Sequence, residues 1–392
     1  MITKDDNTNN LDSNRRELKG KIIKSLEGLG FSIINGQVTP PAYPDKDSIR
    51  NMYLTERKKF VNQRSTWLEQ VEKRALHYFA SGNEISPPLV DPRLELVESP
   101  LQVDLFRYAC LLWSIPVSPG YGRRMRFLVF DNYNDKLIGV FGLSDPVYCL
   151  SVRDSWIGWA DSQKRKRLWH TMDAYVLGSV LPYSYLLGGK LVALLATSNE
   201  VRECFINRYA GKASGILGIV REPHLVLLTT ASAMGRSSML NRLKRQNETF
   251  WQSVGMTAGW GHFHLGNGLF SDIADFMRKE QPTKFATYKF GGGPSWKLRI
   301  IRSCLQELSI PSDALKHGIK REFFAAPLAS NWREYLCTED IHPAFYDRPA
   351  KDLMTYFRER WLLPRSLRDQ RYKDITRGDV QRSVRAEARG EN

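Results

Sequence analysis

The sequence of 392 residues lacks most of the features that define specialised classes of protein. It has only five cysteines, and no two of them have the C-x-x-C spacing of a metal site. Scattered, unpaired cysteines are typical of reduced thiols in a cytoplasmic protein. No apolar run reaches the ~18 residues of a membrane-spanning helix, and the polar residues 1–20 do not resemble a signal peptide. We therefore expect a cytoplasmic protein with no membrane partner and no bound metal.

Acidic residues are also in the minority. The chain has 57 Lys and Arg against 42 Asp and Glu, which gives a formal net charge of +15. A surplus of this size favours a polyanionic partner such as nucleic acid (DNA or RNA) or an acidic protein, although charge spread thinly over a large surface is the alternative. Basic residues gather in segments 120–127, 162–170, 241–246 and 351–389. The candidate nucleic-acid contacts are Arg123, Arg124, Arg126, Lys164, Arg165, Lys166, Arg236, Lys297 and Arg299.

The remaining composition is that of a globular protein, with 42% hydrophobic and 25% charged residues. Apolar runs of strand length alternate with amphipathic helical segments between residues 153 and 265. We expect an α/β (α+β) fold whose mixed central sheet, flanked by helices, occupies residues 96–280. A helical module over residues 1–95 precedes it, and a basic, mainly helical region over residues 281–392 follows it.

Individual elements can be placed within this frame. Two apolar runs joined by Asn-Tyr-Asn-Asp predict an antiparallel hairpin over residues 125–143, and Asn35-Gly36 predicts a second hairpin. Further strands are expected at 148–154, 174–181, 224–230 and 255–265. Helices are expected at 48–79, 190–209 and 237–245, and segment 289–308 is expected to be a glycine loop followed by a basic amphipathic helix.

The glycine pair Gly188-Gly189, followed by Lys190, stands between an expected strand and an expected helix. Free backbone N–H groups at a helix start attract phosphate, although a glycine pair also simply turns the chain. The expected order is hairpin, strand, helix, strand, glycine loop, helix, strand, helix, strand. This order is similar to the acetyltransferase-like fold, in which the loop holds the pyrophosphate of acyl-coenzyme A. Leu186 and Leu191 depart from the loop pattern of that fold.

Two histidines, His262 and His264, alternate along the expected strand 255–265 and would share one face of the sheet. They are weak candidates for a general base and its partner. A hydrogen-bonded structural pair is the commoner outcome. A second glycine-rich segment, Phe290 to Pro294, resembles a phosphate loop but lacks the Lys-Ser or Lys-Thr that completes one.

Long segments of the sequence resemble the DruA family of Druantia anti-phage defence systems. They include KDSIRNMYLTER, WSIPVSPGYGRRMRFLVFD, SDPVYCLSVRDSWIGW, FGGGPSWKLRIIR and HGIKREFFAAPLASN. The resemblance implies a cytoplasmic defence protein that acts with a helicase-like partner and other small subunits. It transfers no catalytic residue to this sequence.

Two classes of function therefore stay open. One is a non-enzymatic defence subunit that binds nucleic acid or partner subunits, with no cofactor. The other is an acyl-coenzyme A-dependent N-acyltransferase-like enzyme, with acetyl-coenzyme A at Gly188 to Lys190 and His262 or His264 as the base. The basic charge and the incomplete loop favour the first class.

Overall fold

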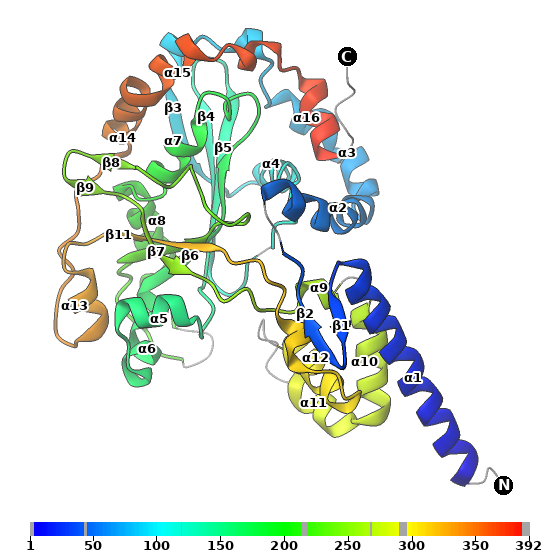
Figure 1. Cartoon of the computed structure of the whole chain (residues 1–392). Coiled ribbons are helices and arrows are strands. Elements are labelled where there is room, and N and C mark those ends of the chain that lie inside the picture. Colours follow the sequence, from blue (N-terminus) through cyan, green and yellow to red (C-terminus); the bar gives the residue numbers. More distant parts are fainter. Residues whose placement is uncertain are drawn as a thin grey trace. The chain divides into compact units, whose positions relative to one another are not determined.

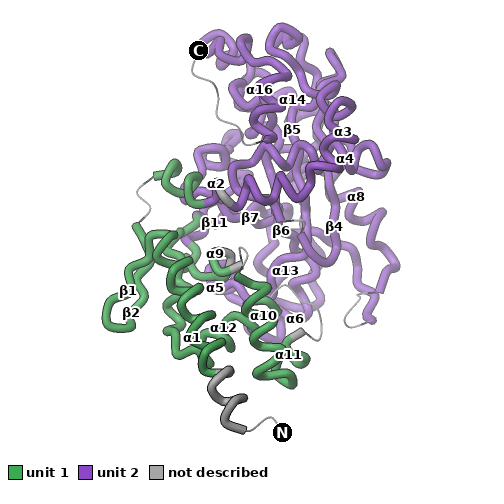
Figure 2. The backbone as a smooth tube through the Cα atoms, turned by 90° about the vertical axis from the view of Figure 1, so that its right-hand side faces the viewer, with its two compact units in different colours: residues 1–52, 257–321 green, residues 53–256, 322–392 purple. Residues whose placement is uncertain are grey.

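The structure of the chain is a computed structural model, and it describes residues 4–42, 45–118, 120–213, 218–266, 269–289 and 296–385 (Figure 1). The chain divides into two compact units (Figure 2). Unit 1 comprises residues 1–52 and 257–321, and unit 2 comprises residues 53–256 and 322–392. Each unit combines segments that are distant in the sequence.

Unit 2 is built around a seven-stranded mixed sheet, which confirms the expected mixed α/β class. The strand order is β10-β11-β7-β6-β5-β4-β3. Neighbouring strands run antiparallel except β6 and β7, which pair in parallel and are connected through two helices, as a parallel pair requires. The strands are β3 (Pro92–Leu96), β4 (Arg124–Asp131), β5 (Lys136–Ser144), β6 (Thr171–Ser179), β7 (Leu227–Ala231), β10 (Gln252–Met256) and β11 (Glu322–Pro327).

Helices cover both faces of this sheet (Figure 1). One face packs against α7 (Gly188–Leu195), α8 (Asn199–Tyr209) and α14 (Ala350–Phe357). The other face packs against α3 (Ser65–His77), α4 (Pro100–Cys110) and α16 (Arg377–Val384). The remaining helices of this unit include the end of α2 (Lys46–Asn62), α5 (Ser151–Ile157), α6 (Asp161–Arg167), α13 (Trp332–Cys337) and α15 (Leu363–Arg368).

The alternation of β4 explains how its two faces differ. Met125 and Phe127 lie in the core beneath α7 and α8, whereas Leu128 and Phe130 lie in the core beneath α3 and α4. Successive side chains of a strand point to opposite faces, so odd and even positions of β4 face different helices. The same rule separates the arginines at the start of the strand.

Unit 1 has a hydrophobic core of its own, which includes Ile22, Leu26, Ile273, Met277 and Ile300. The expected hairpin around Asn35-Gly36 is confirmed as β1 and β2. The helices and strands of this unit are α1 (Lys4–Gly28), β1 (Ser32–Ile34), β2 (Gln37–Thr39), α9 (Phe263–Gly266), α10 (Leu269–Glu280), α11 (Pro282–Lys289) and α12 (Trp296–Glu307). No described helix of either unit is both long and apolar enough to cross a membrane.

Two strands expected from the sequence were wrong. Residues 148–150 precede helix α5, and residues 151–154 belong to it. The buried Arg153 guanidinium donates to Val147 O (2.7 Å) and Tyr148 O (2.9 Å), and these hydrogen bonds hold the chain in a turn before the helix. The strand expected over 255–265 is β10, which lies earlier and ends at Met256. Gly259 then takes a φ of 67°, a left-handed conformation that ends an extended run.

Three expected helices also differ from the structure. The segment 48–79 forms two helices, α2 and α3, with a break at Gln63 and Arg64. The segment 190–209 likewise forms α7 and α8. The helix expected over 237–245 is wrong, since these residues form turns that lead into the short strand β8 (Lys244–Arg245), which pairs with β9 (Glu248–Thr249).

Candidate nucleic-acid interface

One pocket of unit 2 combines arginines with aromatic rings. Its volume is about 430 Å³. Side chains from α2, α3, α4, β4 and β6 meet there, and none of the described residues that line it is acidic. We call it the basic aromatic pocket. Its arginines are Arg64, Arg107, Arg124 and Arg126, and its rings are Phe60, Trp67, Phe106 and Tyr175.

The register of β4 places two of the predicted arginines in this pocket. Arg124 and Arg126 share the face that packs against α4, and the Arg126 guanidinium lies 5.6 Å from the centre of the Phe106 ring. Arg123, one position earlier, takes other partners. Its Nε lies 2.8 Å from Asp145 Oδ1, and its guanidinium lies 3.7 Å from the centre of the Trp169 ring. The predicted arginine trio is therefore split, with Arg123 engaged inside the protein.

The four arginines of the basic aromatic pocket lack acidic partners. Within the described part of the chain, none of them forms an ion pair. Burial and then the positive charge of Arg107 lower the pKa of Arg64, although an arginine stays protonated. Positive charges that repel one another without a counterion attract an external anion.

Two buried polar groups of the pocket also lack partners. Arg126 Nε and Tyr175 Oη are buried, and neither makes a hydrogen bond to a described residue. Burial raises the pKa of Tyr175, and the neighbouring Arg126 guanidinium opposes that rise, so the phenol keeps its proton. Unsatisfied buried donors are uncommon in folded proteins and point to an absent water or ligand.

The basic residues of helix α6 are mostly paired. Lys164 is buried and lies 3.4 Å from Asp154 Oδ2. Arg165 lies 3.0 Å from Asp161, and Lys166 lies 2.5 Å from Glu339. These predicted contacts have carboxylate partners within the chain, the last two at its surface, in contrast to Arg124 and Arg126.

The other predicted basic contacts lie elsewhere. Arg236 is exposed in a loop of unit 2. Lys297 and Arg299 belong to α12 of unit 1, where Lys297 Nζ lies 5.0 Å from the centre of the Phe270 ring and Arg299 donates to Tyr288 O at 2.9 Å. The glycine-rich segment 290–294 lies outside the described residues.

The glycine loop is filled by protein atoms. Gly188 and Gly189 begin α7 and are buried. A Cβ on Gly189 would lie 2.7 Å from Met239 Sδ, and one on Gly188 would lie 2.9 Å from Tyr183 O. Lys190 Nζ donates to the carbonyl oxygens of Met239 (3.0 Å) and Asn241 (3.3 Å). The glycines therefore permit close packing, and the lysine satisfies carbonyl groups of a neighbouring turn.

The two candidate histidines lie in unit 1, whereas the glycine loop lies in unit 2. They do not share a strand face, since His262 precedes α9 and His264 lies within it. His264 is buried, its Nε2 lies 2.7 Å from Ala314 O, and its ring stacks on Phe31. Burial lowers the pKa of both histidines. These contacts support a structural role for His264.

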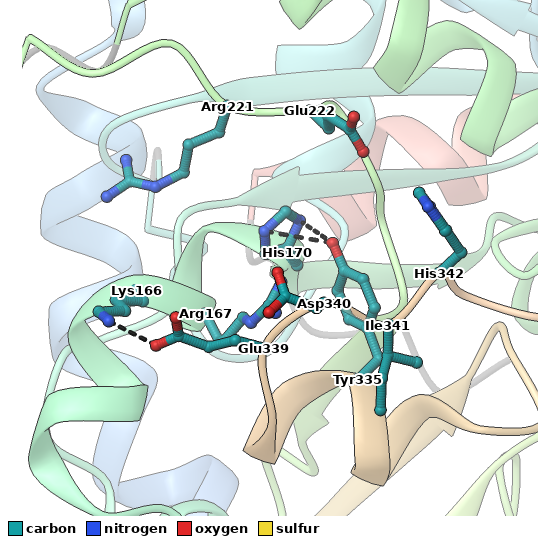
Figure 3. A pocket seen from close by; sticks show the side chains of 10 residues that line it. All are labelled: Lys166, Arg167, His170, Arg221, Glu222, Tyr335, Glu339, Asp340, Ile341 and His342. Atoms are coloured by element: carbon teal, nitrogen blue, oxygen red, sulfur yellow. Dashed lines mark hydrogen bonds and ion pairs between the residues drawn. The ribbon is translucent and has the colours of Figure 1, made fainter.

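A second pocket of unit 2, of about 510 Å³, was not anticipated from the sequence (Figure 3). The Tyr335 hydroxyl lies 3.2 Å from His170 Nδ1 and 3.1 Å from His224 Nδ1. Burial lowers the pKa of His170 to about 3, so that imidazole is neutral. Both acidic and basic side chains line this pocket, and Lys166 pairs with Glu339 (Figure 3). We call it the histidine–tyrosine pocket.

Sequence reasoning missed Arg64, Arg107 and the rings beside them. Arg64 stands at the break between α2 and α3, which a single long helix over 48–79 conceals. Arg107 and Phe106 are adjacent in α4, but nothing local indicates that they meet β4. The alternation of β4 could be predicted from the sequence and places Arg124 and Arg126 on one face, whereas Arg123 precedes the strand.

The fold and the pocket define a mixed α/β protein with an unneutralised arginine-rich site. A family model described as "Druantia protein DruA" matches residues 43–338. A protein of Escherichia coli (strain UMEA 4076-1) named "Druantia protein DruA" is 39% identical over 368 residues, which cover 93% of this chain and 91% of that relative. The chain therefore belongs to the DruA family of Druantia anti-phage defence systems. No solved structure matches the chain significantly.

Proposed function

We propose that this DruA-family protein is the nucleic-acid-associating subunit of its defence system, and that it binds DNA or RNA through the basic aromatic pocket. The observation that carries the proposal is the convergence of Arg64, Arg107, Arg124 and Arg126 without a described carboxylate partner. Guanidinium groups bind phosphate through paired N–H donors, and such contacts supply most of the non-specific affinity for nucleic acid.

The overall charge of the chain is consistent with this proposal. A net charge of +15 accelerates encounter with a polyanion, and the pocket supplies a place for the contact. The helicase-like partner enters the proposal through the family resemblance. A subunit that holds the strand would deliver it to an enzyme that acts on nucleic acid.

An acyl-coenzyme A-dependent N-acyltransferase-like enzyme is the second candidate. The order β6, glycine loop, α7, α8, β7 supports an acetyltransferase-like scaffold, because the loop precedes a helix that connects a parallel strand pair. Met239, packed on Gly189, and the engaged Lys190 weigh against a pyrophosphate at that loop. We rank this candidate second for that reason.

A binding assay with matched variants tests the first candidate. Arg124→Ala combined with Arg126→Ala removes two unpaired charges, and Arg165→Ala combined with Lys166→Ala removes two paired charges as the control. At low salt we expect the first pair to weaken the affinity for a labelled oligonucleotide about tenfold or more and the control to weaken it less than threefold. Equal losses would place binding elsewhere, and absence of binding by the unmodified protein would refute the proposal.

A further inference from the structure

Two aromatic rings of the basic aromatic pocket have no described aromatic ring or cation stacked on them. Trp67 in α3 and Tyr175 in β6 both line it and are half-buried. Among the described residues, neither ring has an aromatic partner or a cation over its face. Phe60 differs, because the Arg64 guanidinium lies 3.5 Å from the centre of its ring. Unstacked rings beside guanidinium groups are the chemistry that receives a nucleobase.

The protein holds both rings in place. Trp67 Nε1 donates to Asp104 Oδ1 at 3.1 Å, which fixes the orientation of the indole. Tyr175 packs against Gly142, where an added Cβ would lie 2.4 Å from Tyr175 Cζ. A ring that is already ordered loses little conformational entropy when a ligand stacks on it.

Groups that can donate hydrogen bonds stand beside the rings of the pocket. Arg126 and Tyr175 both line it and neighbour each other, so a guanidinium and a phenol are present there. Nucleobase carbonyl oxygens and ring nitrogens are acceptors, and they are exposed once a base leaves its stack. The volume of about 430 Å³ lies within the ~300–1,000 Å³ of small-ligand pockets.

We propose that the basic aromatic pocket binds an unpaired nucleobase, so that the preferred partner is a single strand and not a duplex. This inference rests on the proposed function and narrows it. Arg64, Arg107 and Arg124 contact the flanking phosphates, while Trp67 and Tyr175 provide the stacking surface. A base inside a duplex is stacked and paired, so moving it into a pocket costs the free energy of unstacking and unpairing. A base in a single strand is not paired, and this cost is smaller.

Fluorescence anisotropy with the full chain tests this at low salt. The labelled probes share one length: a single-stranded DNA that does not pair with itself, an RNA of the same sequence, the blunt DNA duplex, and a single strand whose central residues are abasic. We expect the intact single strands to bind about tenfold more tightly than the duplex and than the abasic strand. The comparison of the DNA and RNA strands shows whether the 2′-hydroxyl group of the sugar changes the affinity.

Variants then locate the base. Trp67→Ala is expected to weaken single-strand binding about tenfold and duplex binding much less, and Trp67→Phe to restore most of the loss. Tyr133→Ala removes an exposed ring from the β4–β5 turn and serves as the control with no effect. Equal affinity for abasic and intact strands overturns the base pocket while leaving nucleic-acid binding intact. If the unmodified protein binds none of the probes, the proposed function itself is refuted. The abasic comparison uses the unmodified protein and decides the matter even if Trp67→Ala does not fold.

Discussion

The basic aromatic pocket and the histidine–tyrosine pocket lie in the same unit, yet they treat their charges in opposite ways. The first holds four arginines without an ion pair among the described residues. In the second, Lys166 pairs with Glu339 and two histidines share hydrogen bonds with Tyr335. The second pocket is lined by equal numbers of basic and acidic residues, namely Lys166, Arg167 and Arg221 against Glu222, Glu339 and Asp340. The comparison teaches that the balance of charge within a pocket, more than the count of basic residues in the chain, identifies a site for an anion.

The same contrast recurs between neighbours on one strand. Arg123 and Arg124 are adjacent in the sequence, but the first has a carboxylate, a carbonyl and aromatic rings around it. Arg124 is exposed at the basic aromatic pocket. Substitutions at these two positions therefore separate a structural arginine from a binding one.

The largest expected effect is on stability. Arg123→Ala leaves the partly buried Asp145 without its partner and removes the packing against Trp169, so we expect a loss of ~3 kcal/mol in the free energy of unfolding. Arg124→Ala should change that free energy by less than ~0.5 kcal/mol. Urea denaturation of both variants measures the difference. If the two variants had similar free energies of unfolding, Arg123 would not have the structural role that distinguishes it from Arg124.

In cells, loss of phage protection should differ between variants of the basic aromatic pocket and a variant of the candidate base His262. Replacing Arg124 and Arg126 together by Ala should reduce protection more than His262→Ala does, because the first removes the proposed nucleic-acid contact. Plaque assays at matched protein levels make the comparison. A catalytic base typically contributes ~10²-fold or more in rate. Abolished protection in His262→Ala alone would therefore promote the enzymatic candidate.

The histidine–tyrosine pocket gives a smaller effect that depends on pH. Burial holds the pKa of His170 at about 3, below the 6.5 of an exposed imidazole. The unfolded chain therefore binds more protons between these values, and the free energy of unfolding should fall as the pH drops from about 6.5 toward 3. His170→Gln should flatten that dependence in thermal denaturation between pH 6.5 and 4. An unchanged slope would show that other groups control the acid sensitivity.

The smallest expected effect is a null result at the glycine loop. Met239 packs on Gly189 and Lys190 is engaged, so acetyl-coenzyme A at sub-millimolar concentration should leave the melting temperature unchanged. A ligand raises the melting temperature only by binding the native state. Differential scanning fluorimetry provides the test, and a clear upward shift would overturn the ranking of the two candidates.

Much of the sheet was predictable from local patterns. The β4–β5 hairpin, β6 and β7 all have apolar runs of strand length. In unit 1, the pair Asn35-Gly36 directly indicates the turn of the separate β1–β2 hairpin. The pairing of β11 with β7 and β10 was not predictable, because β11 follows β10 only after most of unit 1. No local signal reports such a non-local contact.

The candidate site was predictable only in part for the same reason. Arg124 and Arg126 stood out as a basic cluster, but the rings beside them and their companions Arg64 and Arg107 come from α2, α3, α4, β6 and the break between α2 and α3. Conversely, Lys164 and Arg123 looked equally suitable in the sequence, and only the fold supplies their carboxylates. Charge neutralisation depends on tertiary neighbours, which composition does not contain.

The salt dependence of single-strand binding tests the central claim most directly. Each phosphate contact releases counterions and adds about 0.7 to the slope of log K against log salt for a single strand. If Arg107 and Arg124 contact phosphate, their joint replacement by Ala should lower the magnitude of that slope by about 1.4. Arg165→Ala with Lys166→Ala removes the same net charge and should leave the slope nearly unchanged. An equal reduction in both variants, or none in the first, would contradict the account.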